Sequence, residues 1–162
     1  MKQDFLQVDL DLDVKEREQL CNILQVLLAS SYCLYLKTQN FHWNVTGPNF
    51  HSYHLMFQDQ YEELAQAIDE IAERIRALGY FPEGSLASFA KSSLVRDTEG
   101  VSPPMRMVEK LLSDHELIIR YLREGLPLAE RATDGATADF INKRLAIHEK
   151  TAWMLRSILE AF

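Results

Sequence analysis

The sequence has no unbroken apolar stretch close to the eighteen or so residues that a membrane-spanning helix requires. Residues 1–14 instead alternate acidic and apolar side chains, which is unlike an export signal. Cysteine is scarce: Cys21 and Cys33 are the only two, and on one helix they would lie about 18 Å apart, too far for a mutual disulfide. These absences predict a reduced, cytoplasmic protein with no membrane span.

Positive charge is also in short supply. The 162 residues carry a net charge of −7, so attraction to DNA phosphates would need a local basic patch. No such patch is evident, and before Lys15 the only basic side chain is Lys2, among several aspartates. We therefore expect DNA binding to be weak or absent.

What is present suits one soluble domain. Apolar residues make up 47% of the chain and charged residues 25%, and the length is right for a single core. We expect this domain to cover residues 1–162, with 1–14 as an N-terminal extension.

Apolar residues recur at helical spacing in four long segments, which predicts an all-α chain. The first segment starts at Glu16 and should end in the turn-forming cluster at 46–49. The second runs from Tyr61 to Leu78, with Gly79 as the left-handed residue that follows a helix.

The third and fourth helices follow a long connection over residues 80–102. Within that connection, residues 85–90 have the pattern of a short helix. Ser102 and Pro103 suit the N-cap and the first position of the third helix.

Gly125 and Pro127 are expected to end the third helix. The last apolar stripe begins at Ile141 and reaches Phe162. Two helical hairpins joined by one long crossover describe a ferritin-like four-helix bundle.

Four polar residues of the second helix, His54, Gln58, Asp69 and Glu73, lie within about 100° of arc at the edge of its apolar stripe. Asp69 and Glu73, at i and i+4, can point at one cation. His54 lies about 22 Å away along the axis, so one chain cannot close a site with all of them. Two antiparallel copies of the helix about a two-fold axis would close two equivalent sites, and His42 could join His54 in each.

These residues belong to a longer pattern that resembles the signature of the Dps family, the starvation-induced bacterial mini-ferritins. The matching segments are Phe41-His42-Trp43-Asn44, Gly47, Phe50, His54, Asp69-Glu70-Ile71-Ala72-Glu73-Arg74 and Leu78-Gly79. The spacings from His42 through Glu73 all match, and the predicted helices extend the resemblance over nearly the whole chain.

The resemblance implies a hollow dodecameric shell with ferroxidase sites at its two-fold interfaces. There, Fe(II) would be oxidised by peroxide in preference to dioxygen and stored inside as ferric mineral, which protects against oxidative damage. His42, His54, Asp69 and Glu73 would be the iron ligands, and imidazole and carboxylate donors suit both oxidation states of iron. Trp43 matches the family tryptophan thought to trap stray oxidising equivalents.

One position departs from the family pattern, which places a carboxylate four residues after the second histidine. Gln58 stands there, and its neutral oxygen attracts a cation less than an anion would. Glu62 is the nearest acidic side chain with a similar direction. A weakened second subsite leaves open a shell that binds a single metal, iron or zinc, and oxidises iron slowly.

Other readings of the same residues stay open. Asp69 and Glu73 alone could be a solvated pair near Arg76. His115 and His148 lie within apolar stripes, which favours hydrogen-bonded core histidines over metal ligands. His51 fits a surface position at a helix start.

The resemblance also places acidic iron-entry pores near the start of the fourth helix. Asp139 is the leading candidate, with Asp134 and Glu130 as substitutes. The competing interpretation is that these three side chains cap or solvate helix ends. A competing function, DNA compaction, is disfavoured by the missing basic tail.

Overall fold

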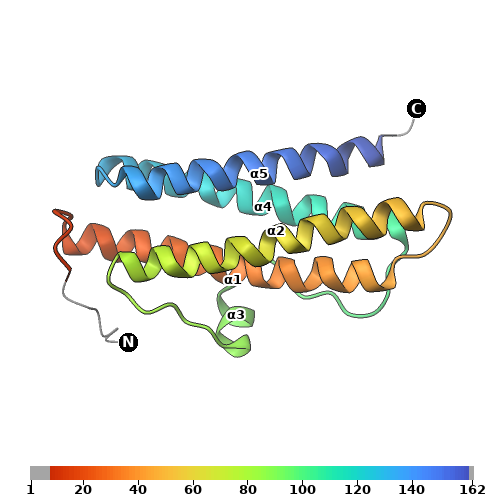
Figure 1. Ribbon diagram of the computed structural model, residues 1–162, viewed down its shortest axis with the longest axis horizontal. Coiled ribbons are helices and arrows are strands. Elements are labelled where there is room, and N and C mark those ends of the chain that lie inside the picture. Colours follow the sequence, from red (N-terminus) through yellow and green to blue (C-terminus); the bar gives the residue numbers. More distant parts are fainter. Residues whose placement is uncertain (1–7, 161–162) are drawn as a thin grey trace.

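Four long helices form two antiparallel hairpins, α1–α2 and α4–α5, and a short helix, α3, lies against α1 (Figure 1). The computed structural model describes residues 8–160. The bounds of the helices are α1 Val14–Asn44, α2 Phe50–Ala77, α3 Leu86–Ser92, α4 Pro104–Arg131 and α5 Gly135–Leu159. The predicted all-α bundle with a small helix in the crossover is confirmed.

The first hairpin has the predicted turns. Helix α1 starts two residues earlier than expected because Asp13 caps it, accepting hydrogen bonds from the backbone N–H groups of Lys15 and Glu16 at 2.8 and 3.2 Å. Helix α2 ends at Ala77, and Gly79, with a φ of 93°, is the left-handed residue that follows it, as predicted. The N–H of Tyr80 then reaches back to the carbonyl of Ile75 at 3.2 Å, which completes a Schellman cap.

The crossover is fixed to α1 by its short helix. Ser85 caps α3, as its oxygen accepts from the N–H of Ser88. The buried ring of Phe89 packs 4.8 Å from the ring of Tyr32, and the N–H of Leu94 donates to the hydroxyl of Ser30 at 3.0 Å. The predicted short helix is therefore confirmed, two residues longer at its C-terminal end.

Helix α4 differs from the prediction at both ends. Its N-cap is Pro103 rather than Ser102, and it continues to Arg131 instead of ending at Gly125 or Pro127. Pro127 has no N–H, so the carbonyl one turn earlier loses its helical hydrogen-bond partner. Because Pro127 is exposed, that carbonyl is on the solvent side. Tertiary packing thus outweighs the local signal for a break.

Gly125 marks a close approach between helices, because a Cβ there would lie 3.0 Å from Cγ2 of Ile23 in α1. The left-handed residue that ends α4 is Thr133, at a φ of 56°. Helix α5 then runs to Leu159, and Phe162, the predicted end of the fourth stripe, lies outside the described residues.

The apolar faces of the four long helices meet in one core. Its fully buried members include Leu24, Leu27, Phe57, Ile71, Leu111, Ile118 and Leu155. Among the described helices only α1 is long and apolar enough to cross a membrane, and 56% of that stretch is buried in the bundle, as in the core helix of a soluble protein. Cys21 and Cys33 are both free, as predicted, and burial raises the pKa of Cys21 to about 11.

Candidate metal centre

His42 and His54 form a stacked pair across the first hairpin. Their ring centroids are 3.8 Å apart, with 21° between the planes. Nδ1 of His42 lies 2.8 Å from the backbone oxygen of His54, and Nδ1 of His54 lies 2.9 Å from the backbone oxygen of His42. A carbonyl only accepts, so both Nδ1 atoms carry a proton, and the neutral form of each ring has its lone pair on Nε2.

Aromatic rings hold this pair in place. Tyr61 stands edge-on to His42 at 5.2 Å between centroids, and Phe50 lies 5.0 Å from His54. Trp43, next to His42 in the chain, is 63% exposed. Backbone carbonyls that orient a histidine ring are the usual support of a metal ligand, so the pair is preset for coordination through Nε2.

Asp69 and Glu73 are exposed on α2, and within residues 8–160 no hydrogen bond or ion pair involves their carboxylates. Arg76, which could have paired with them, instead donates to the carbonyl of Tyr80 at 3.1 Å and lies 4.0 Å over the ring of Phe81. Two neighbouring anions therefore face outward with their charge unbalanced by the chain.

The structure brings the two histidines together but does not bring the carboxylates to them. In the described part of the chain, no group of three or more His, Cys, Asp or Glu side chains converges as a metal site would. A site that used all four side chains would need a second copy of α2.

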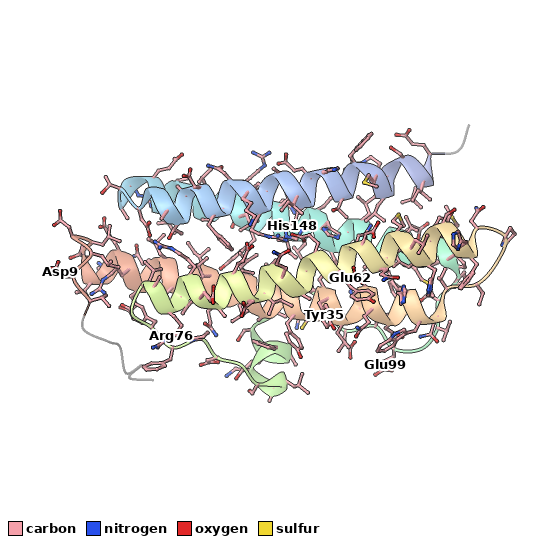
Figure 2. All side chains as sticks on the ribbon, viewed as in Figure 1. Asp9, Tyr35, Glu62, Arg76, Glu99 and His148 are labelled. Carbon is pink, nitrogen blue, oxygen red and sulfur yellow. The ribbon has the colours of Figure 1, made fainter. Side chains whose placement is uncertain are left out.

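Gln58 and Glu62 lie one and two turns beyond His54 on α2. The amide nitrogen of Gln58 donates to Oε1 of Glu62 at 2.8 Å, which leaves the amide oxygen of Gln58 available. Glu62 is exposed on the first hairpin, near Tyr35 in Figure 2. The anion that the family pattern places at residue 58 is thus held one helical turn away.

His115 and His148 form the second histidine pair, inside the bundle. Their Nδ1 atoms are 2.8 Å apart, and a guanidinium nitrogen of Arg144 lies 3.3 Å from Nε2 of His148. Arg144 is fully buried and also pairs with Glu63. The prediction of hydrogen-bonded core histidines is confirmed (Figure 2 shows His148 between the hairpins).

Burial and the positive charge of Arg144 keep both of these rings neutral. Burial is the larger cause in each, lowering the pKa of His115 to about 3 and the pKa of His148 well below its usual value. Sequence analysis missed Arg144 and Glu63. The available signal was an arginine four residues before His148 on an otherwise apolar stripe.

The three pore candidates have different surroundings. Asp134 is buried and caps α5, accepting two bonds of 2.8 Å from Arg74 as well as the hydroxyl and N–H of Thr137. Burial alone would raise the pKa of Asp134, but the bonds from Thr137 and Arg74 outweigh it and lower the pKa. The structure gives Asp134 the capping role, whereas Asp139 and Glu130 are exposed.

Comparison with known proteins agrees with this architecture. The ferritin-like domain model matches residues 21–162. DNA protection during starvation protein 2 of Bacillus anthracis is 34% identical over 142 residues, which is 88% of this chain and 97% of that one. An uncharacterized low temperature-induced protein of Nostoc is 39% identical over 155 residues, covering 94% of this chain and 87% of the relative.

Solved structures give the same answer. The Dps protein of Bacillus brevis superposes with a TM-score of 0.88 at 32% identity, over 92% of this chain and all of that one. The Dps protein of Vibrio cholerae, described as a member of the ferritin-like diiron-carboxylate superfamily, gives 0.91 at 28% identity, over 97% and 99%. The fold and the matching domain model thus define a ferritin-like protein. Within that class, the chain belongs to the Dps family.

Proposed function

We propose that this protein oxidises Fe(II), with hydrogen peroxide as the preferred oxidant, and stores the ferric product inside a shell of its own copies. The observation that carries the proposal is the His42–His54 pair, whose reciprocal bonds to backbone carbonyls leave both Nε2 atoms free to bind a cation. A histidine pair kept only for packing would not need this preset tautomer.

The site would be completed across a two-fold axis. Asp69 and Glu73 lie on the same helix as His54, are exposed, and have no cationic partner among the described residues. Antiparallel packing of two α2 helices would bring these anions to the histidines of the other copy and generate two sites. We infer a homo-oligomer, with the dodecamer of the family resemblance as its expected size.

The residues would have distinct tasks in the reaction. His42 and His54 supply neutral donors, while Asp69 and Glu73 supply the negative charge that favours the change from Fe(II) to Fe(III). Four donors leave coordination positions open for the oxidant. Exposed Trp43 lies next to His42 in the chain. Peroxide takes up two electrons and a single Fe(II) supplies only one, so Trp43 is placed to supply the other.

The second iron subsite is where this chain differs from the family pattern. Gln58 offers only an amide oxygen, and its bond to Glu62 holds that carboxylate close by. We expect Glu62 to support weak binding of a second iron. Zinc is the competing metal for the histidine-rich half of the site.

The relatives named for DNA protection suggest a role in stress. With a net charge of −7, this chain would protect DNA in the cytoplasm by removing Fe(II) and peroxide rather than by binding tightly to the duplex. Gel retardation without divalent metal checks this. Exposed Asp139, with Glu130 as a substitute, remains our candidate for the iron-entry pore.

The test is anaerobic titration with Fe(II), with and without zinc, followed by peroxide or air. We expect saturable binding at two-fold sites and oxidation that is faster with peroxide than with air. Equal rates in the presence and absence of the protein would refute the proposal.

A further inference from the structure

Three tyrosines continue the ring contacts of the His42–His54 pair from α2 across to α1. Tyr61 of α2 stands edge-on to His42 at 5.2 Å between ring centroids, and the ring of Tyr35 in α1 lies 6.0 Å from that of Tyr61. Tyr32, one turn before Tyr35, continues the series at 6.0 Å. Each distance is usual for packed aromatic rings, so the series is unbroken from a candidate iron ligand to the side of α1 that contacts α3.

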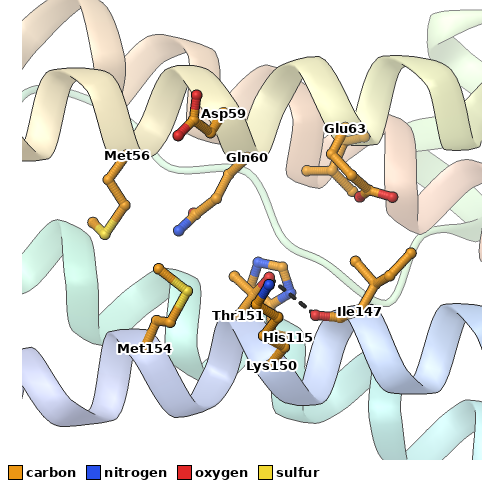
Figure 3. Close-up of a pocket in the computed structure, with 10 residues that line it drawn as sticks. Met56, Asp59, Gln60, Glu63, His115, Ile147, Lys150, Thr151 and Met154 are labelled. Carbon is orange, nitrogen blue, oxygen red and sulfur yellow. Dashed lines mark hydrogen bonds between the residues drawn. The ribbon is translucent and has the colours of Figure 1, made fainter.

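Helical spacing explains this placement. Tyr61 lies seven residues after His54, and Tyr35 lies seven residues before His42, so each tyrosine shares a face of its helix with a histidine. The opposite side of α2 has no such series. It borders a cavity of about 340 Å³ between α2 and α5, whose described lining residues include two methionines but no tyrosine or tryptophan (Figure 3). The tyrosines next to the histidine pair therefore lead toward α1.

A hydrogen bond makes Tyr35 a suitable holder of a radical. Nε2 of Gln39 donates to the phenol oxygen of Tyr35 at 3.0 Å. The oxygen of a phenoxyl radical only accepts hydrogen bonds, so this bond stabilises Tyr35 after the loss of its hydrogen atom. Trp43, by comparison, is 63% exposed, and within residues 8–160 its ring packs against no other aromatic ring. Tyr61 therefore contacts the candidate iron ligands more directly than Trp43 does.

The residue at position 58 gives these tyrosines a task. In the proposed function, Gln58 leaves the second iron subsite weak, so a site often holds a single Fe(II). That ion supplies one of the two electrons that peroxide takes up. Such a site needs a store for one oxidising equivalent until another Fe(II) arrives.

We propose that Tyr61, Tyr35 and Tyr32 form this store, and the inference rests on the proposed function. Peroxide takes one electron from Fe(II) and one from Tyr61. With the phenol proton of Tyr61 and one proton from solvent, it becomes two water molecules. The Tyr61 radical then takes an electron and a proton from Tyr35, and Tyr35 exchanges in the same way with Tyr32. A second Fe(II) returns the electron, solvent returns the proton, and each peroxide yields two Fe(III).

Rapid-freeze electron paramagnetic resonance tests the store directly. Assembled protein is loaded anaerobically with one Fe(II) per site, mixed with an equal amount of peroxide and frozen at successive times. Absorbance follows Fe(III) in a parallel sample. We expect an organic radical whose signal narrows when the tyrosines are ring-deuterated, which assigns it to tyrosine rather than tryptophan. A second Fe(II) per site should abolish the signal as that iron is oxidised.

Phenylalanine variants keep the ring packing and remove the hydroxyl. Tyr61→Phe should lose the tyrosyl signal, whereas Tyr35→Phe should keep a radical on Tyr61 that decays severalfold faster. Tyr53→Phe is the matched control. Tyr53 precedes His54 on α2, but its ring stacks on Phe57 rather than on a histidine, so this variant should give the signal of the unmodified protein.

The possible outcomes separate this inference from the proposed function. A radical that is insensitive to tyrosine deuteration, or a tyrosyl signal that persists in Tyr61→Phe, would overturn the store. Fe(II) that is oxidised by peroxide without any radical would also overturn it, and the proposed function would stand. Fe(II) that is not oxidised by the unmodified protein would overturn both.

Discussion

The two histidine pairs of this bundle differ in their hydrogen-bond partners. His42, at 8% exposed, is buried like His115 and His148, at 3% and 0%, whereas His54 is half-buried. In the first pair both Nδ1 atoms bond to backbone carbonyls, so both Nε2 atoms stay free. In the second pair the rings bond to each other and to Arg144, so no lone pair is left for a metal.

The difference shows that burial alone does not identify a ligand. Which nitrogen carries the proton decides whether a histidine can coordinate, and that depends on its hydrogen-bond partner. We therefore propose the pair at the edge of α2 as iron ligands, whereas the pair in the core contributes to stability.

The largest expected effect comes from removing one histidine of the His42–His54 pair. His54→Ala should slow peroxide-driven Fe(II) oxidation by about a hundredfold or more, since it removes a ligand outright. The shell should still assemble, as most buried contacts of α2 are apolar. Stopped-flow absorbance measures the rate, and His51→Ala, at an exposed position in the first turn of α2, is the control that should match the unmodified protein.

The His115–His148 pair is disrupted by replacing Arg144, which donates to His148. Arg144→Met should lower the free energy of unfolding by about 3 kcal/mol, because Glu63 and His148 lose a buried partner. Lys143→Met, which removes an exposed ion pair with Glu70, should cost about 1 kcal/mol or less. Denaturant titration compares the two, and equal losses would mean that the buried cluster is not structural.

The sequence predicts the helices and turns of this protein better than the directions of its side-chain hydrogen bonds. Apolar spacing and turn residues located both hairpins, the short helix and the cap at Gly79. The prediction that Gly125 and Pro127 end the third helix was wrong. The effect of these residues depends on packing against a neighbouring helix and on solvent exposure, which the local sequence pattern does not contain. The reciprocal bonds of His42 and His54 likewise depend on how two helices meet.

Lowering the pH should destabilise the fold through the His115–His148 pair. In the unfolded chain His115 and His148 take up protons near pH 6.5. In the folded protein His115 stays neutral down to about pH 3, and the pKa of His148 is also well below its usual value. The stability that depends on neutral rings is thus complete above pH 6.5 and is lost as the pH falls toward 3. The slope should be up to about 1.4 kcal/mol per pH unit for each ring, and shallower in His115→Phe. Thermal unfolding of metal-free protein across this range measures it.

A smaller effect is expected at Gln58. Gln58→Glu restores an anionic oxygen one turn from His54 and should raise the affinity for a second iron by about tenfold. Isothermal titration with Fe(II) under nitrogen reports it, with Gln60→Glu, on the other side of α2, as the control. An unchanged stoichiometry would mean that Glu62 already completes the subsite.

The central claim is that each iron site is shared between two subunits, and mixed shells test it most directly. His54→Ala and Asp69→Ala chains are each expected to be inactive alone. Where the two meet at a two-fold interface, one site carries both defects and the other carries neither. Co-assembled shells, with mixing verified by native mass spectrometry, should therefore recover about a quarter of the sites if the chains pair at random. Verified mixed shells as inactive as either variant alone would contradict the shared site.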